Sequence, residues 1–186
     1  MTGDLGVDSP EPAGDGALVV RDATPADVEQ VLAFVHALAR FEREPEAVRA
    51  TRDDYLRDGF GPDPAFGALL AHVGPRPAGL ALWFRTYSTW EGRPGLWLED
   101  LWVEPWARSR GIGRALVAGL AARAVACGWA RLDLSVLDWN PARDFYDRLG
   151  FRELAAWRPY RLEGERLRAL ARELAATTSG DGPASG

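Results

Sequence analysis

The spacing of apolar residues along the chain predicts helices that alternate with strands. From Val28 to Ala39 the apolar residues recur at the period of a helix that buries one face. The preceding segment, Thr24-Pro25-Ala26-Asp27, offers a capping threonine, a proline at the first helical position and an acidic first turn. We therefore expect a helix that begins at this segment and is broken at Glu44-Pro45.

Four further segments have helical character. A short helix is expected over 51–58 and closed by Gly59, and a longer one, ended by Gly128, follows a glycine-rich turn. Asn140 and Pro141 are expected to cap a helix that runs to Leu149, and a last helix is expected over 165–175. The predicted buried face of the long helix consists of Ile112, Leu116, Val117, Leu120 and Ala124.

Short apolar runs predict the strands of one sheet. Strands are expected at 18–20, 66–73, 78–85, 96–103, 132–136 and 157–162. A Gly-Pro turn makes 66–73 and 78–85 a hairpin, and a loop over 87–95 joins that hairpin to the central strand 96–103. A helix separates 96–103 from 132–136, which predicts a parallel crossover pair. The fold class is therefore α+β, with a central, mostly antiparallel sheet and helices on both faces.

Length and composition predict one domain. Nearly half of the 186 residues are hydrophobic, which is enough to bury a good core. Residues 1–16 and 177–186 are rich in small and polar types, so both are expected to be disordered tails around a domain at 17–176.

Charge and residue usage exclude several functions. The net charge of −5 argues against general nucleic-acid binding and favours cationic small molecules as partners. Every basic residue is arginine, which fits a GC-rich bacterial genome. With one cysteine, Cys127, expected to be buried, and two distant histidines, we expect no disulfide and no metal site. We find no leader or membrane-spanning segment, so we expect a cytoplasmic protein that binds no membrane.

The stretch from Leu98 to Leu116 carries the main chemical signal. An apolar strand leads through an arginine- and glycine-rich turn into a helix. The first N–H groups of a helix have no intrahelical partner, and the helix dipole favours an anion there. Arg108, Arg110 and Arg114 strengthen this tendency because guanidinium groups bind phosphate oxygens in pairs. The stretch predicts a phosphate site, although the glycines alone would also fit an ordinary helix start.

A second motif follows this turn in the expected order. Arg108-x-x-Gly111-x-Gly113 is followed by Asn140, by Phe145-Tyr146 and by Leu149-Gly150-Phe151. The two motifs together resemble the GCN5-related N-acetyltransferase (GNAT) superfamily. Further segments, including Leu98-Glu99-Asp100, resemble its diamine acetyltransferase group, which includes spermidine/spermine and thialysine N-acetyltransferases.

The resemblance implies a GNAT acyl-CoA N-acyltransferase fold, a homodimer, acetyl-CoA as the donor and a primary amine as the acceptor. It implies that the backbone of the central strand holds the pantetheine arm and that the glycine turn holds the pyrophosphate. It also implies an asparagine that binds a pantetheine amide. The residues at these positions are Leu101, Trp102 and Val103; Arg108, Ser109, Arg110, Gly111, Ile112, Gly113 and Arg114; and Asn140.

For catalysis, the resemblance implies that Tyr146 protonates the leaving thiolate and that Glu99 accepts the proton of the amine. Glu42, Trp90 and Asp100 match positions that face the acceptor. The interval between Asn140 and Tyr146 is one residue shorter than is usual in the family.

Each of these assignments has a structural alternative. Tyr146 could be an aromatic at the edge of the core, and Glu99 a structural carboxylate. Glu42 could be a solvated helix end, and Trp90 could pack within its loop. Ser88 stands where polyamine-specific members carry an acidic residue, which weakens polyamines as the acceptor.

Three functions are compatible with the chain. The first is direct acetyl transfer from acetyl-CoA to a small diamine, polyamine or lysine-like amine within a ternary complex. The second is the same reaction with a protein lysine or N-terminus as acceptor. The third is a non-catalytic module that senses acetyl-CoA.

Overall fold

The computed structural model describes residues 16–178. These residues form two compact units, one that ends at Arg143 and one that begins at Asp144. The predicted tails lie outside the described residues, except for Gly16 and for Thr177 and Thr178, which end the last helix. No helix among the described residues has the length and apolar character needed to cross a membrane.

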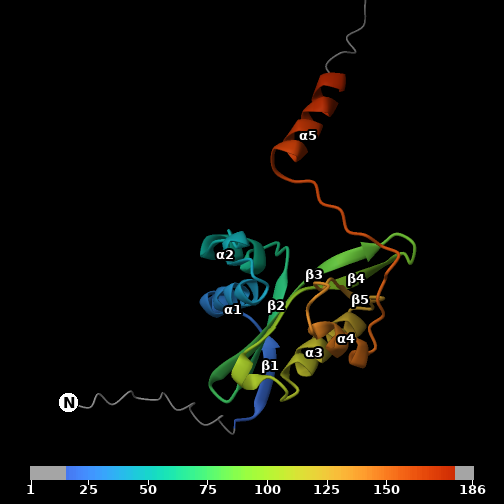
Figure 1. Cartoon of the computed structure of the whole chain (residues 1–186). Coiled ribbons are helices and arrows are strands. Elements are labelled where there is room, and N and C mark those ends of the chain that lie inside the picture. Colours follow the sequence, from blue (N-terminus) through green and yellow to red (C-terminus); the bar gives the residue numbers. More distant parts are fainter. Residues whose placement is uncertain (1–15, 179–186) are drawn as a thin grey trace, which may run out of the picture. The chain divides into compact units, whose positions relative to one another are not determined.

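The first unit is built on a five-stranded sheet with the order β1-β2-β3-β4-β5 (Figure 1). The first four strands pair antiparallel, and β4 pairs parallel with β5. This confirms the predicted mixed sheet and its parallel crossover pair. The strands are β1 Leu18–Asp22, β2 Gly67–Val73, β3 Arg76–Ser88, β4 Arg93–Val103 and β5 Leu132–Leu134.

All five predicted helices are present, and their bounds differ little from those expected. Three short 3-10 turns, η1 Pro25–Asp27, η2 Pro45–Ala47 and η3 Pro105–Ala107, add to them. The helices are α1 Val28–Phe41, α2 Arg52–Phe60, α3 Ile112–Ala126, α4 Ala142–Leu149 and α5 Gly164–Thr178.

Helices α1 and α2 cover one face of the sheet (Figure 1). The start of α1 is fixed by Asp27, whose carboxylate accepts hydrogen bonds from the backbone N–H and the hydroxyl of Thr24, both at 2.8 Å. The buried side of α1, including Phe34, joins a core cluster with residues of β2 and β3 such as Leu70 and Leu80. Tyr55 of α2 joins the same cluster.

Helix α3 covers the opposite face, so helices lie on both faces as predicted. The five residues expected to be buried are the five that are buried. The helix lies close to the sheet: a Cβ placed on Gly79 of β3 would be 3.1 Å from Cδ1 of Leu116. Gly128, with φ of 67°, follows the end of α3 and terminates it as expected.

Three expectations are wrong. Gly59 does not close α2, which continues to Phe60; a Cβ on Gly59 would be 2.6 Å from the ring of Phe66, so this glycine permits close packing. Residues 157–162 form no strand, because no ladder pairs with them. Cys127 is exposed rather than buried, because it is the C-cap residue of α3 and follows the last helical turn.

Candidate active site

A β-bulge lies at the centre of the candidate site. Leu82 of β3 pairs with Asp100, and the next residue, Trp83, pairs with Leu98. Glu99 is therefore the extra residue of β4, with no partner on β3. Bulges change the direction of side chains and often accompany functional sites. Here the bulge places two consecutive carboxylates, Glu99 and Asp100, near the middle of β4.

The edge of β4 that faces β5 is paired over only a short length. Parallel pairing runs from Leu96 to Leu98, opposite Leu132 to Leu134. Beyond that point, no described strand pairs with β4 on this side from Glu99 to Val103. Backbone polar groups without a ladder partner can bind an extended ligand in the manner of an added strand. It includes Leu101 to Val103, which the family resemblance implies would hold a pantetheine arm.

The turn between β4 and α3 ends in a left-handed residue. Gly111 is the N-cap of α3 with φ of 78°, and no side chain caps this helix end. A Cβ on Gly111 would meet nothing within 4 Å, so backbone conformation rather than space explains the glycine. Ser109, also with positive φ at 61°, and Arg110 are exposed next to it. Helix N–H groups without a side-chain cap, with arginines nearby, are groups that can bind an anion.

Arg108 is held against aromatic rings beside this turn. Its Nε donates a hydrogen bond to the carbonyl of Val103 at 3.1 Å. Its guanidinium lies over the ring of Trp102, at 5.0 Å from the centroid, and over that of Phe41, at 5.6 Å. The side chain of Arg108 thus joins the end of β4 to the end of α1, while Arg110 and Arg114 are exposed beside the turn.

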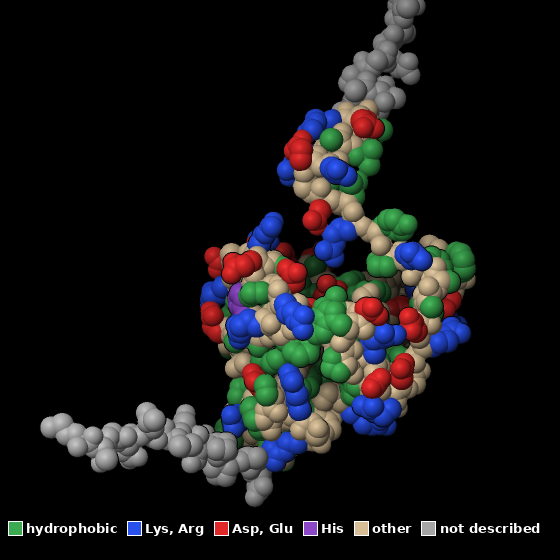
Figure 2. All heavy atoms as spheres, in the orientation of Figure 1, with side chains coloured by type: hydrophobic (Ala, Val, Ile, Leu, Met, Phe, Trp, Pro, Cys, Tyr) green, Lys and Arg blue, Asp and Glu red, His purple; other side chains and the backbone are tan. Residues whose placement is uncertain are grey.

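An acidic cavity of about 280 Å³ opens between α2 and β4. Four of its lining residues carry carboxylates, two from each element, and most of the others are apolar or aromatic. Figure 2 shows acidic side chains gathered over α2. A lining that combines apolar side chains with carboxylates suits an aliphatic chain that carries positive charge. The lining residues are Ala50, Asp54, Tyr55, Asp58, Phe66, Leu82, Glu99 and Asp100.

Asp100 has the most perturbed carboxyl group of the cavity. Its pKa is raised to about 6, first by burial and then by the negative charges of Glu99 and Glu42. No described group donates a hydrogen bond to its side chain. Nearby Tyr55, itself a buried residue, has its pKa raised to about 12, first by burial and then by the charge of Asp100. A carboxyl group that titrates near neutrality can accept and return a proton.

Glu99 and Glu42 are the two carboxylates whose charges act on Asp100. Nε1 of Trp97 donates a hydrogen bond to Oε2 of Glu99 at 2.7 Å, which fixes the direction of an exposed carboxylate. Glu42 is the C-cap of α1 and is half-buried, and burial raises its pKa. The structure therefore brings together three predicted acceptor-side residues, Glu42, Glu99 and Asp100.

Two predicted residues lie apart from the acidic cavity. Trp90 is 90% exposed at the turn between β3 and β4 and does not line the cavity. Asn140 is buried, and its Oδ1 accepts a hydrogen bond from the backbone N–H of Ala142 at 2.9 Å. Its side-chain oxygen thus starts α4, as the sequence predicted for Asn140-Pro141.

Tyr146 belongs to the second unit. It is half-buried on α4, with its ring 5.2 Å from that of Phe145 and 5.6 Å from that of Phe151. Both contacts are edge-to-face, a favourable geometry for aromatic pairs. These contacts fix the ring within the motif that suggested its role.

The residues that α2 contributes to the cavity are not part of the motifs that predicted the site. Asp54, Tyr55 and Asp58 were assigned only to a short helix. A signal was available, because positions four apart lie on one face of a helix, and Asp54 and Asp58 have that spacing. What could not be predicted was that this face lies opposite β4.

Comparisons with known proteins agree with this geometry. Residues 31–151 match the model of the Acetyltransferase (GNAT) family. The chain is similar to thialysine N-epsilon-acetyltransferase of Sus scrofa, with 35% identity over 83% of this chain and 98% of that protein. It is also 31% identical to spermidine/spermine N(1)-acetyltransferase-like protein 1 of Homo sapiens, over 83% of this chain and 24% of that protein. Among solved structures, the integron cassette protein VCH_CASS6 of V. cholerae has the same fold, with a TM-score of 0.69 and 24% identity over 83% of this chain and 98% of that one.

Proposed function

The chain belongs to the GNAT family of acetyltransferases, and we propose that it transfers the acetyl group of acetyl-CoA to a primary amine of a small, cationic molecule. The observation that carries this proposal is the acidic cavity beside the bulge of β4. It is small, it has an apolar wall, and its carboxylates attract an ammonium group. A diamine, a polyamine or a lysine-like amino acid has the required chemistry.

The donor would bind on the other side of β4. The unpaired edge from Leu101 to Val103 would hold the pantetheine arm, and the turn from Arg108 to Arg114 would hold the pyrophosphate. Asn140 would contribute its side-chain amide N–H₂, since its oxygen caps α4. When bound, acetyl-CoA supplies a thioester whose carbonyl carbon the amine attacks and whose sulfur leaves as a thiolate.

The carboxylates of β4 would prepare the amine. An ammonium group has no lone pair, so it must lose a proton before it can attack. Glu99, oriented by Trp97, is the proposed proton acceptor, directly or through water. Asp100 would share the proton, because its raised pKa lies closer to neutrality than that of an ordinary carboxyl group. Glu42 would add negative charge beside them.

Tyr146 would protonate the departing thiolate. A phenol is protonated at neutral pH and can give its proton as the thiolate forms. The amine and the thioester would react directly in one ternary complex, so that positioning supplies most of the rate acceleration.

We further propose that the protein works as a cytoplasmic homodimer. Three leucines recur along α5 and are exposed, namely Leu167, Leu170 and Leu174. Figure 2 shows apolar side chains along one side of this helix. An exposed apolar helix face is a common protein contact. Light scattering at micromolar concentration tests the dimer, and a monomeric mass would contradict it.

The release of the CoA thiol tests the proposed reaction. Small diamines, polyamines, lysine analogues and aminoglycosides are offered with acetyl-CoA, beside a lysine-containing peptide and an alcohol of matched length. We expect release with small amines and none with the alcohol. Release with the peptide alone would replace this proposal by a protein acetyltransferase. Binding of acetyl-CoA without release from any acceptor would replace it by a sensing module.

A further inference from the structure

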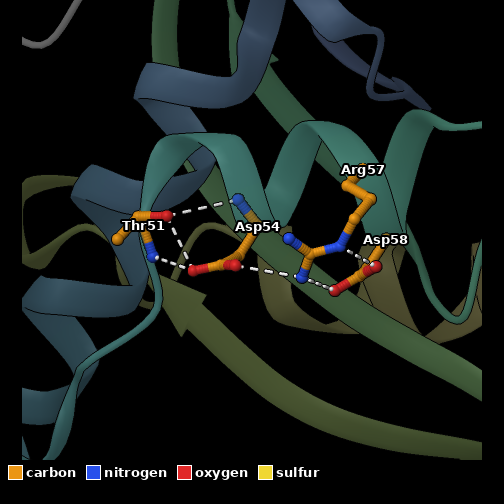
Figure 3. Close-up of polar contacts among 4 residues, drawn as sticks. All are labelled: Thr51, Asp54, Arg57 and Asp58. Carbon is orange, nitrogen blue, oxygen red and sulfur yellow. Dashed lines mark hydrogen bonds and ion pairs between the residues drawn. The ribbon is translucent and has the colours of Figure 1, made fainter.

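Arg57 binds the two carboxylates that α2 presents to the acidic cavity (Figure 3). Its Nε and Nη2 donate to the two oxygens of Asp58 at 2.8 and 2.6 Å, a paired geometry. The same Nη2 lies 2.9 Å from Oδ1 of Asp54. The second oxygen of Asp54 accepts from the hydroxyl of Thr51 at 2.6 Å and from its backbone N–H at 2.9 Å. Both oxygens of Asp54 and both oxygens of Asp58 therefore already have a partner.

The carboxylates that β4 contributes to the cavity have fewer hydrogen-bond partners. No described group donates a hydrogen bond to Asp100, and Glu99 accepts only the indole N–H of Trp97 among the described residues. The cavity is also lined by Tyr55 and Phe66, whose rings meet edge-to-face at 5.3 Å. The carboxylates that β4 contributes to the cavity are therefore available to an ammonium group, whereas those that α2 contributes already bind the guanidinium of Arg57.

We propose that Arg57 determines which acceptors the enzyme selects. Arg57 occupies the α2 carboxylates and so disfavours acceptors that place a second ammonium group beside them. The inference rests on the proposed function. An acceptor with one ammonium group would bind at Glu99 and Asp100 and lay its carbon chain along Tyr55 and Phe66. A second ammonium group would meet a carboxylate pair whose charge is partly cancelled. A zwitterionic end, as in an amino acid, has no net charge for Arg57 to repel.

Three acceptors of equal chain length separate these cases. Pentylamine has one amine, cadaverine has two, and lysine is cadaverine with a carboxylate added at one end. We expect Arg57→Gln to lower the KM for cadaverine roughly three- to tenfold, because loss of one charge a few ångströms away in a solvated site changes binding by that order. The KM for pentylamine should change less than twofold, and kcat should be nearly constant for both.

The matched control is Arg52→Gln on the same helix. Arg52 carries the same charge and binds Glu29 at 2.9 Å, but the structure shows no contact of its guanidinium with Asp54 or Asp58. Asp58→Asn should raise the KM for cadaverine relative to pentylamine in the Arg57→Gln background, whereas Asp53→Asn should not. Calorimetric titration of cadaverine gives the same ranking without turnover.

The outcomes are distinguishable. If Arg57→Gln and Arg52→Gln leave the ratio of cadaverine to pentylamine KM equally unchanged while both amines are acetylated, the role of Arg57 is refuted and the proposed function stands. If no variant acetylates any amine, the proposed function fails. A tighter cadaverine titration for Arg57→Gln would then still support the binding role of Arg57, and an unchanged titration would refute it.

Discussion

Trp97 and Glu99 lie on the same side of β4, with the indole Nε1 donating a hydrogen bond to the carboxylate Oε2 at 2.7 Å. The sequence left two interpretations of Glu99 open, a proton acceptor and a structural carboxylate. A single donor from a neighbouring residue orients the group without enclosing it, since Glu99 is exposed and lines the cavity. Orientation of this kind suits a residue that positions an amine.

Replacing Trp97 by Phe tests this orientation. The ring stacks against Phe84, and phenylalanine preserves much of that contact while removing the donor. We expect kcat/KM for the amine to fall roughly five- to thirtyfold, from the loss of one hydrogen bond to a charged group. Steady-state kinetics provide the measurement. Trp157→Phe is the control, because Trp157 is exposed in the second unit, and an equal loss in both variants would count against the role of Trp97.

The raised pKa of Asp100 predicts opposite effects of pH on activity and stability. Acceptor kcat/KM should rise as pH increases through about 6, because the ionised carboxylate attracts the amine. Stability should fall over the interval from about pH 4 to pH 6, because the unfolded chain ionises this group first, and the full penalty persists above pH 6.

Asp100→Asn removes both effects. We expect this variant to be at least as stable as the wild type at about pH 8, equal to it near pH 4, and much less active. Thermal melts and pH profiles of kcat/KM provide the two measurements. A variant that is less stable at high pH would show that the ionised carboxylate stabilises the fold, contrary to this account.

Gly111 and Gly92 provide a matched pair for the turn before α3. Both have positive φ, 78° and 63°, and a Cβ on either would meet nothing within 4 Å. Alanine should therefore destabilise the fold by about 1 kcal/mol at each position. Only Gly111→Ala should weaken the binding of CoA, measured by calorimetry, because only that backbone is proposed to face the pyrophosphate. Equal CoA affinities for the two variants would contradict this placement.

Tyr146→Phe tests the proposed acid. The ring contacts with Phe145 and Phe151 should persist, so we expect unchanged folding and an unchanged KM for acetyl-CoA. The value of kcat should fall by roughly a hundredfold or more, as is typical when a general acid is lost. Tyr160, which is 94% exposed in the same unit, gives the control Tyr160→Phe. A kcat within twofold of the wild type for both variants would exclude Tyr146 as the acid.

Local signals predicted the helices well and the strand lengths less well. The Thr24 cap and the apolar period fixed α1, and the five buried positions of α3 were all correct because each depends on sequence neighbours. The connection expected over 87–95 is a shorter turn, because β3 and β4 remain paired as far as Ser88 and Arg93. The strand expected over 157–162 is absent for the opposite reason, because strand propensity alone does not provide a neighbouring strand to pair with.

The candidate site shows the same division. The glycine turn and the Glu99-Asp100 pair are contiguous in sequence and could be found there. The bulge that leaves Glu99 unpaired depends on the register between β3 and β4, and the role of Asp54 and Asp58 depends on how α2 crosses the sheet. Neither of these long-range relationships has a local signature.

The most direct test of the account is to detect the products by mass spectrometry after incubating the full-length protein with acetyl-CoA and a lysine-like or diamine acceptor. The account predicts acetylated amine and free CoA in equal amounts, with the protein itself unmodified, because the transfer is direct. Free CoA without acetylated amine, or no product from any amine despite bound acetyl-CoA, would contradict it.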